Sequence, residues 1–240
     1  MVELSSHKNE LLSSLPSGET KLIAPHLVDV EIADGHILFN PGDIIREAYF
    51  PSTAVLSVMN VTRDGQTVEV AAVGNDGMVG LRLFYDDDEA IARVMCQVPG
   101  HAFKIEGDTF WHLVRHQPGL RHVIHQHAHA FLFEVFQSAA CNKIHGIPQR
   151  FARWLLTKQD RSDRTTFPLG EGKIAAMLNV TLPTVRGLIR QLRDRRVIAV
   201  RGEDISIVNR PGLEGIACEC YERVRLELFK ISVKRRSVPT

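Results

Sequence analysis

The spacing of apolar residues along the chain first predicts a run of short strands. Between about residues 28 and 105, apolar residues form short or alternating runs. Turn sequences such as Asp34-Gly35, Asp64-Gly65 and Gly74-Asn75-Asp76-Gly77 separate these runs. Short strands with glycine-containing turns every eight to twelve residues or so are typical of an antiparallel barrel or roll. We therefore predict a β-roll over this part of the chain.

Helical spacing replaces the strand pattern after Gly107. Phe110 and Val114 predict a short helix that is interrupted near Pro118-Gly119. A long helix is then predicted from about Leu120 to His145, because this stretch contains neither Pro nor Gly. Gly146-Ile147-Pro148 ends the long helix and makes a natural hinge.

The predicted long helix is apolar on two sides. A helix of this kind usually packs against its own domain with one side and against a partner with the other. We therefore predict a homodimer that is held together through this helix. One side runs through Leu120, Ile124, His127, Phe131, Glu134, Ser138 and Cys141, and the other through Leu132, Val135 and Ala139.

Residues 174–198 predict two short helices joined by a tight turn. Asn179 stands where the chain reverses, and Asn tolerates the left-handed backbone better than most residues. Thr181 is a candidate N-cap for the second helix, and Pro183 falls in its first turn, where a missing N–H costs nothing. The pattern is that of a helix-turn-helix, whose second helix enters the major groove of DNA. An antiparallel helix pair with a solvated basic face is the alternative.

The neighbouring segments extend this motif into a domain. Phe151 and Trp154 mark an amphipathic helix before it, and residues 160–168 are predicted to be a loop. After it, the chain predicts a hairpin that turns near Gly202-Glu203-Asp204. A helix-turn-helix followed by a hairpin is a winged helix, and Arg201 is a candidate phosphate contact on the wing.

The net charge of +1 conceals a division between the two parts of the chain. Residues 1–145 contain 10 Lys and Arg against 18 Asp and Glu, whereas residues 146–240 contain 19 against 10. Basic charge concentrated on a small domain is typical of phosphate binding. The charge pattern therefore favours a nucleic acid as the partner of the second part.

Composition excludes several other classes of protein. The hydrophobic content of 44% and charged content of 24% are those of a soluble globular protein, and no apolar run is long enough to span a bilayer. The N-terminus lacks a secretion signal, and four scattered cysteines do not form a disulfide scaffold, so we expect a cytoplasmic location. No P-loop, dinucleotide fingerprint or recognisable Ser-His-Asp grouping indicates an enzyme.

Several motifs occur in a specific order along the chain. The predicted roll contains Gly35-x-x-Leu38-x-x-Pro41-Gly42-Asp43 and Tyr49-Phe50. Further along are RFARWLL at residues 150–156, IAxML at 174–178, and RPGLE and ACECY at 210–214 and 217–221. In this order, over about residues 10–230, the chain resembles the superfamily of the cyclic-AMP receptor protein and the fumarate–nitrate reductase regulator (Crp/Fnr).

This resemblance implies an α+β fold in three parts. The parts are a sensor β-roll with flanking short helices over residues 1–118, a long dimerisation helix over 119–145, and a winged helix-turn-helix domain over 146–240. It also implies a homodimer that binds a near-palindromic promoter site on double-stranded DNA and regulates transcription together with RNA polymerase. The effector is unknown, and we predict no cofactor.

The chain departs from the family at the cyclic-nucleotide cassette. Family members that bind cyclic nucleotides carry Gly-Glu-Leu, a short loop and Arg-Ser or Arg-Ala, in which the arginine neutralises the cyclic phosphate. The nearest match here begins Gly80-Leu81-Arg82, and Ala90-Ile91 stand where that arginine is expected, with Arg93 three residues late. The acidic run of residues 86–89, which we expect to be an exposed loop, would repel a phosphate. We therefore predict that the effector is not cyclic AMP.

A second departure lies in the recognition helix. Relatives often read bases with an early Arg-Glu pair and an arginine one turn later, whereas this chain has Leu182, Pro183 and Gly187 at the matching positions. A bidentate arginine–guanine contact is lost there, although Arg186 or Arg190 can substitute in a different register. The candidate DNA-binding residues are Thr181, Leu182, Thr184, Arg186, Gly187, Arg190 and Arg201.

Two alternative functions remain open from the residues. A metal- or haem-containing sensor would use the histidines of the long helix, together with Cys141 and His145 four residues apart. Cys218-x-Cys220 has no second paired motif with zinc spacing, so we assign no metal ligands. In the other alternative the winged helix binds a protein. The excess of basic residues in residues 146–240 argues against this alternative. The histidines concerned are His122, His125, His127 and His129.

Overall fold

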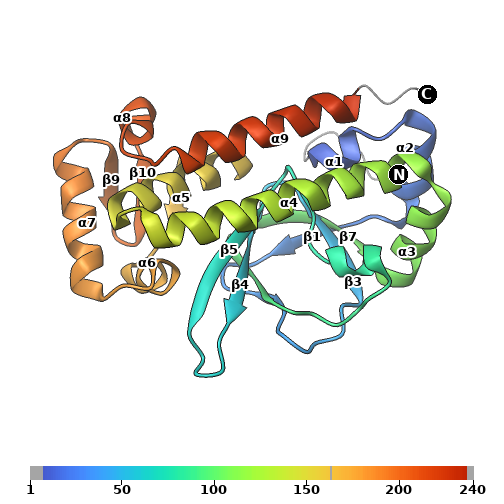
Figure 1. The fold of residues 1–240 in the computed structure, drawn as a ribbon, viewed down its shortest axis with the longest axis horizontal. Helices are drawn as coiled ribbons and strands as arrows, with labels where there is room; N and C mark the ends of the chain where they lie inside the picture. The colour runs from blue at the N-terminus through green and yellow to red at the C-terminus, as the bar shows by residue number, and fades with distance from the viewer. Residues whose placement is uncertain (1–7, 163, 237–240) are drawn as a thin grey trace.

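The predicted strands fold into an antiparallel roll. The structure, a computed structural model, describes residues 8–162 and 164–236 (Figure 1). The strands form two sheets, with the orders β1-β7-β3 and β2-β6-β4-β5, and every pairing in them is antiparallel. The prediction of a β-roll is thus confirmed. The strands are β1 (Val28–Ile32), β2 (Ile37–Phe39), β3 (Glu47–Pro51), β4 (Val55–Val61), β5 (Thr67–Val73), β6 (Arg93–Val98) and β7 (Gly100–Glu106).

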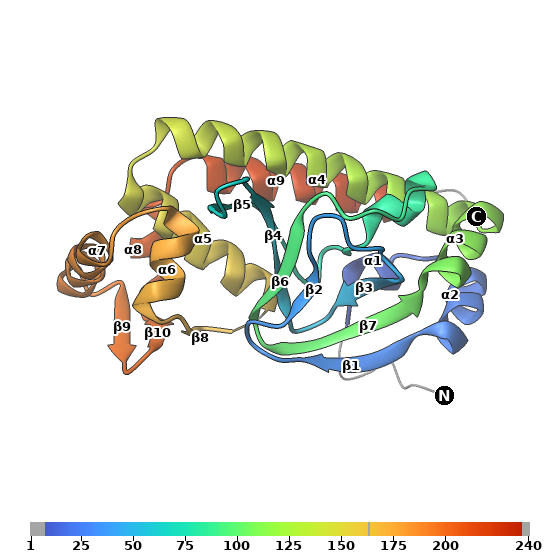
Figure 2. The ribbon, with the colours of Figure 1, turned by 90° about the horizontal axis from the view of Figure 1, so that it is seen from below.

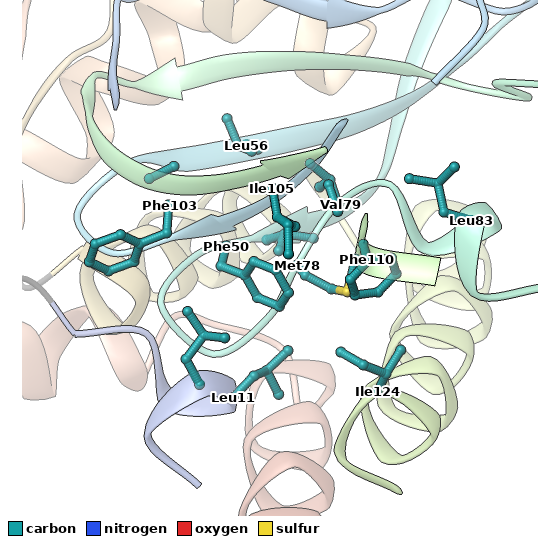
Figure 3. Close-up of a cluster of buried hydrophobic side chains, with 14 of the residues drawn as sticks. Leu11, Phe50, Leu56, Met78, Val79, Leu83, Phe103, Ile105, Phe110 and Ile124 are labelled. Carbon is teal, nitrogen blue, oxygen red and sulfur yellow. The ribbon is translucent and has the colours of Figure 1, made fainter. Parts of the chain in front are cut away.

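Apolar side chains from both sheets and from flanking helices fill the roll. Phe50 and Phe103 extend inward from paired strands, and Phe110 and Leu11 reach the same cluster from helices (Figure 3). The rings of Phe50 and Phe110 meet edge to face with centroids 6.2 Å apart. Burying each such ring contributes about 2–3 kcal/mol to folding. The flanking helices are α1 (Glu10–Ser13), α2 (Ser17–Ile23), η1 (Ala24–His26), η2 (Leu81–Tyr85) and α3 (Gly107–His116).

The long helix α4 (Pro118–Ile144) follows, close to the predicted bounds. Pro118 occupies its first turn, where no backbone N–H is needed. The carboxylate of Glu19 accepts hydrogen bonds from the N–H groups of Gly119 and Leu120 at 2.9 and 2.6 Å. A negative charge on otherwise unpaired N–H groups stabilises a helix N-terminus. The sequence pattern therefore located this helix, and a distant carboxylate caps it.

The two apolar sides of α4 have different surroundings. The first predicted side packs within its own chain, where Leu120, Ile124 and Cys141 are buried. On the second side Leu132 is 50% exposed, and Phe136, which the sequence pattern did not single out, is 66% exposed. In this single chain, the second side is therefore open at Leu132 and Phe136, whereas Val135 packs partly against the core of the roll.

The C-terminal part has the predicted helix-turn-helix and hairpin. One prediction was wrong: residues 160–168 are not a loop throughout, because a helix continues to Ser162 and residues 166–168 form a strand. That strand pairs with the hairpin, so the wing sheet has the order β8-β10-β9. The elements are α5 (Ile147–Ser162), β8 (Thr166–Pro168), α6 (Glu171–Leu178), α7 (Leu182–Asp194), β9 (Ile198–Arg201), β10 (Asp204–Ile207), α8 (Arg210–Glu214) and α9 (Cys220–Arg236).

The C-terminal part is docked against the roll and α4. Helix α9 lies beside α4 in both views (Figures 1 and 2). Val55, Ala72 and Val98 of the roll share a buried cluster with Phe151 and Leu155 of α5. Gly74 permits this approach, because a Cβ there would lie 2.4 Å from the Cβ of Arg161. The backbone of the roll and helix α5 are therefore in direct contact.

Candidate DNA interface and effector cavity

The turn between α6 and α7 has the geometry that the sequence predicted. Asn179 adopts the left-handed conformation, with φ 53° and ψ 56°, and ends α6. The N–H of Val180 then donates to the carbonyl of Ala175, which closes the turn. Val185 and Leu192 of α7 are completely buried against the rest of the domain. One side of α7 thus anchors the helix, and the opposite side is free to meet a ligand.

The start of α7 differs from the prediction in one detail. Thr181 is the N-cap residue, but its side chain makes no capping hydrogen bond. Its hydroxyl lies 3.0 Å from the hydroxyl of Thr184 instead. Pro183 occupies the first turn, as predicted. The first N–H groups of α7 are therefore available to an anion such as a DNA phosphate.

The candidate DNA-binding residues lie on the outer surface. Helix α7 is at one end of the molecule (Figures 1 and 2), and Leu182 near its start is 43% exposed. Arg186 is also exposed, and its Nε donates to a carboxylate oxygen of Glu171 on α6 at 2.8 Å. A Cβ added to Gly187 would meet no atom within 4 Å. Arg201 lies apart from α7, at the end of β9 on the wing. The exposed candidates are Thr181, Leu182, Thr184, Arg186, Gly187, Arg190 and Arg201.

A cavity of about 560 Å³ lies between the roll and α4. Six residues at or near the expected cassette are the candidate ligand contacts, and five of them line the cavity: Gly80, Leu81, Arg82, Ala90 and Ile91. The sixth, Arg93, does not. The Nε of Arg93 instead donates to the side-chain oxygen of Asn40 at 2.9 Å. The lining residues are Phe39, Ile45, Val58, Asn60, Val70, Met78, Val79, Gly80, Leu81, Arg82, Tyr85, Ala90, Ile91, Ala92, Val94, Phe131, Leu132 and Val135.

The cavity is mainly apolar, and its arginine already has a partner. Arg82 forms an ion pair with Asp87, which belongs to the acidic run predicted to be a loop. This partner raises the pKa of Arg82 and lowers the pKa of Asp87. Asn60 and Tyr85 supply the other polar groups of the lining. The arrangement favours an uncharged, largely apolar ligand over an anion.

A buried network of charges joins the C-terminal part to the roll. Arg161 of α5 makes two hydrogen bonds to Glu134 of α4, at 3.0 and 2.7 Å, and one to Asp76 at 2.9 Å. Burial alone would lower the pKa of Arg161, but the attraction of Asp76 and Glu134 outweighs it and the pKa is raised. Lys158 lies 3.4 Å from Glu69, and burial lowers its pKa. The sequence did not predict this network, because its bonded partners are up to 89 residues apart in the chain and share no local motif.

In the described part of the chain, His122, His125, His127 and His129 of α4 do not converge with other His, Cys, Asp or Glu side chains on a possible metal site. His127 is buried, with its Nε2 3.0 Å from the carbonyl oxygen of Met78, whereas His125 and His129 are exposed. A metal- or haem-containing sensor built on this helix is therefore not favoured. The structure does bring Cys141 and His145 together with Cys218 and Cys220. Within the described residues, no helix has the length and apolar character needed to cross a membrane.

Comparison with known proteins agrees with these features. The family model of the cyclic nucleotide-binding domain matches residues 29–117, and that of the Crp-like helix-turn-helix domain matches residues 149–216. Together these matches span most of the roll and the region from α5 to α8. No curated protein sequence matches the chain.

Solved structures, among them that of a transcriptional regulator, have the same fold. FixK2 from Bradyrhizobium japonicum is 14% identical with a TM-score of 0.66, and the alignment covers 80% of this chain and 98% of FixK2. The c-di-GMP responsive global regulator CLP from Xanthomonas campestris is 14% identical with a TM-score of 0.64, covering 81% and 100%. TTHB099, a CRP-family regulator from Thermus thermophilus, is 16% identical with a TM-score of 0.64, covering 78% and 96%. With both family domains present in order around α4, the chain belongs to the Crp/Fnr superfamily of DNA-binding transcription regulators.

Proposed function

We propose that this protein binds a near-palindromic promoter site as a homodimer and regulates transcription together with RNA polymerase. It acts by binding and not by catalysis. The observation that carries the proposal is the exposed outer face of α7 on a domain with an excess of basic residues. In its working form, residues 1–118 sense a ligand, residues 119–145 join the two copies, and residues 146–240 bind DNA.

The contacts that we propose follow from the chemistry of the exposed residues. Leu182 would touch the methyl group of a thymine, since an apolar side chain can contact that methyl group but cannot hydrogen-bond a guanine. Thr184 and Arg190 would bind phosphates, and Arg201 would do so from the wing. Gly187 leaves open space on the helix surface, which supports a close approach of the α7 backbone to the DNA.

The dimer that we propose uses the open side of α4. Leu132 and Phe136 are exposed large apolar residues on this long helix, and a second copy of α4 would cover them. Leu132 also lines the cavity, so a ligand there would touch the proposed dimer surface. Two-fold symmetry would place the two α7 helices in successive major grooves, about 34 Å apart.

The effector that we propose is uncharged and largely apolar. A cyclic phosphate needs a cation that is free to neutralise it, whereas Arg82 is paired with Asp87. Calorimetric titration with cyclic AMP should therefore show no saturable binding. Saturable, stoichiometric binding would contradict this part of the proposal and leave the DNA-binding part untouched.

The DNA-binding proposal is tested by selecting sites from a random DNA pool and measuring affinity at several salt concentrations. Each arginine that contacts a phosphate in both half-sites contributes about −1.8 to the slope of log K against log salt concentration. We expect Arg186→Ala/Arg190→Ala to weaken binding and flatten this slope. Arg63→Ala, in the exposed turn between β4 and β5, is the matched control. Failure to select any site, or an unchanged slope in the double variant, would refute the proposal.

A further inference from the structure

Two pairs of metal-ligating residues meet beside the hinge at Gly146. Cys141 lies in the last turn of α4 and His145 is its C-cap residue, while Cys220 is the first residue of α9 and Cys218 lies two residues before it. One Nδ1 or Nε2 atom of the histidine and the three Sγ atoms all lie within 4.8 Å of one another. This is the one group of three or more His, Cys, Asp or Glu residues found to converge in this way in the described part of the chain.

The separations fit a tetrahedral centre. With Zn–S bonds of about 2.3 Å and a Zn–N bond of about 2.0–2.1 Å, tetrahedral angles place two sulfurs about 3.8 Å apart and a sulfur and a nitrogen about 3.6 Å apart. The Sγ atoms of Cys141 and Cys218 are 3.5 Å apart. The Sγ of Cys220 and the Nδ1 of His145 are also 3.5 Å apart. Small side-chain movements are therefore sufficient for all four atoms to reach one ion.

The ligand set matches the chemistry of zinc. Three thiolates and one imidazole form a set that is common in structural zinc sites, whereas exposed carboxylates and water suit magnesium or calcium. Cys141, Cys218 and Cys220 are almost completely buried and form a small cluster of their own, separate from the two large apolar cores. All three are free cysteines. A closed, fully protein-derived site of this kind has a structural role and no open position for a substrate.

Surrounding groups orient the ligands. The Nε2 of His145 lies 3.2 Å from a carboxylate oxygen of Glu219, which leaves the Nδ1 to face the sulfurs. Such carboxylate–histidine pairs are a usual outer shell of zinc sites. The side-chain N–H of Gln137 donates to the Sγ of Cys220 at 3.0 Å. Zn²⁺ with three thiolates and a neutral imidazole carries a net charge of −1, and the charge of Arg153 acts on Cys141 from nearby.

We propose that Cys141, His145, Cys218 and Cys220 bind one structural Zn²⁺, which fastens the end of α4 to the start of α9. The ion displaces the three thiol protons to solvent and takes the Nδ1 lone pair of His145. Because the two pairs lie on opposite sides of Gly146 in the sequence, the ion restrains the hinge between α4 and the DNA-binding domain. It also sets the position from which α9 runs back along α4.

The test begins with elemental analysis of untagged, full-length protein purified under reducing conditions without a chelator. We expect about one zinc per chain. Removing the zinc and adding Co²⁺ should give the visible bands of tetrahedral cobalt with thiolate ligands. Cys218→Ser/Cys220→Ser should lose the zinc, whereas Cys96→Ser, which removes a buried cysteine of β6 far from the cluster in sequence, should keep it.

A second variant keeps the test decisive if the double variant does not fold. Glu219 is 67% exposed, so Glu219→Gln should leave the fold intact. We expect it to lower zinc affinity by about ten- to a hundred-fold, because the carboxylate no longer orients His145. A zinc chelator should lower the Tm of the wild-type protein and leave the Tm of Cys218→Ser/Cys220→Ser unchanged.

Four results would overturn the proposal. One is reduced, metal-free protein that binds neither added Zn²⁺ nor Co²⁺. Another is zinc that stays at full stoichiometry and affinity in the Cys218, Cys220 and Glu219 variants. A third is iron with visible absorbance in fresh protein, which would indicate an iron–sulfur centre. The last is a disulfide between Cys141 and Cys218 in freshly isolated protein, which would indicate redox chemistry in place of a metal.

Discussion

Replacing Arg161 by methionine should destabilise the protein through the charges that it leaves behind. The Arg161 side chain is 5% exposed and its partner Glu134 is 7% exposed. Arg161→Met removes three hydrogen bonds to carboxylates, and Glu134 then keeps one hydrogen bond, from the N–H of Ala72 at 3.1 Å. Removing one partner of a buried ion pair costs about 3–5 kcal/mol.

The neighbouring lysine places the expected cost at the lower end of that range. Lys158 is buried and is repelled by Arg161, so the substitution relieves part of its unfavourable environment. We expect a loss of about 3 kcal/mol, which for a chain of this length lowers the Tm by roughly 6–12 °C. Urea denaturation monitored by circular dichroism measures the free energy of unfolding.

Two further variants decide whether the mechanism is correct. Arg63→Met removes an exposed arginine of the roll and should change stability by no more than about 0.5 kcal/mol. Arg161→Met/Glu134→Leu removes both charges and should be more stable than Arg161→Met alone, since no uncompensated glutamate remains. The reasoning is refuted if Arg161→Met costs less than about 1 kcal/mol, or if the double variant costs the sum of the two single substitutions.

Three other predictions test the recognition helix, the roll and the proposed dimer. Gly187→Ala should stabilise the protein by about 0.5–1 kcal/mol in urea denaturation, because alanine favours the helix and its Cβ would meet no neighbouring atom. The same variant should weaken DNA binding, because the added methyl group would hold the α7 backbone away from the DNA. Tighter binding would contradict a close approach of this backbone. Burial raises the pKa of the Cys96 thiol from 9.0 to about 12. Because the unfolded chain loses this proton at a lower pH than the folded protein, the free energy of unfolding should fall as the pH rises between these two values. The same titration of Cys96→Ala should show a smaller fall, and an equal fall would disprove this cause. Phe136→Glu should weaken dimerisation at least about tenfold in analytical ultracentrifugation, because an unpaired carboxylate is costly to bury in an interface. Leu22→Glu, which changes an exposed leucine of α2, should leave dimerisation unchanged. A Phe136→Glu dimer of unchanged affinity would place the interface elsewhere.

Local patterns predicted the elements well because the physical signals for them are local. Alternating apolar residues located the strands of the roll, and the absence of Pro and Gly located α4. Asn179 marked the turn of the helix-turn-helix because few other residues adopt its conformation readily. Strand β8 was missed because three residues, Thr166–Pro168, have too little periodicity to be distinguished from a loop, and only pairing with β10 makes them a strand.

The candidate sites were predictable only in part. Exposure of the α7 residues follows from helical spacing, since the buried residues Val185 and Leu192 define the opposite side. The ion pair between Arg186 and Glu171 could not be predicted from helical spacing, because it joins two different helices across the turn. Likewise, sequence spacing placed Arg93 near the expected cassette. In the structure Arg93 hydrogen-bonds Asn40 outside the cavity, and Arg82 is the arginine that lines the cavity.

The sequence by itself determined the class of this protein: a β-roll, a long helix and a basic winged helix, in the order of a DNA-binding regulator. Periodic burial of one face and turn chemistry act over a few residues, so they can be read directly from the chain. The tertiary structure alone decided which distant groups meet. Cys141 and Cys218, 77 residues apart, come to 3.5 Å, and Arg161 finds Asp76 across 85 residues. Such contacts depend on how α5 and α9 pack against the roll and α4, and no local pattern encodes that packing.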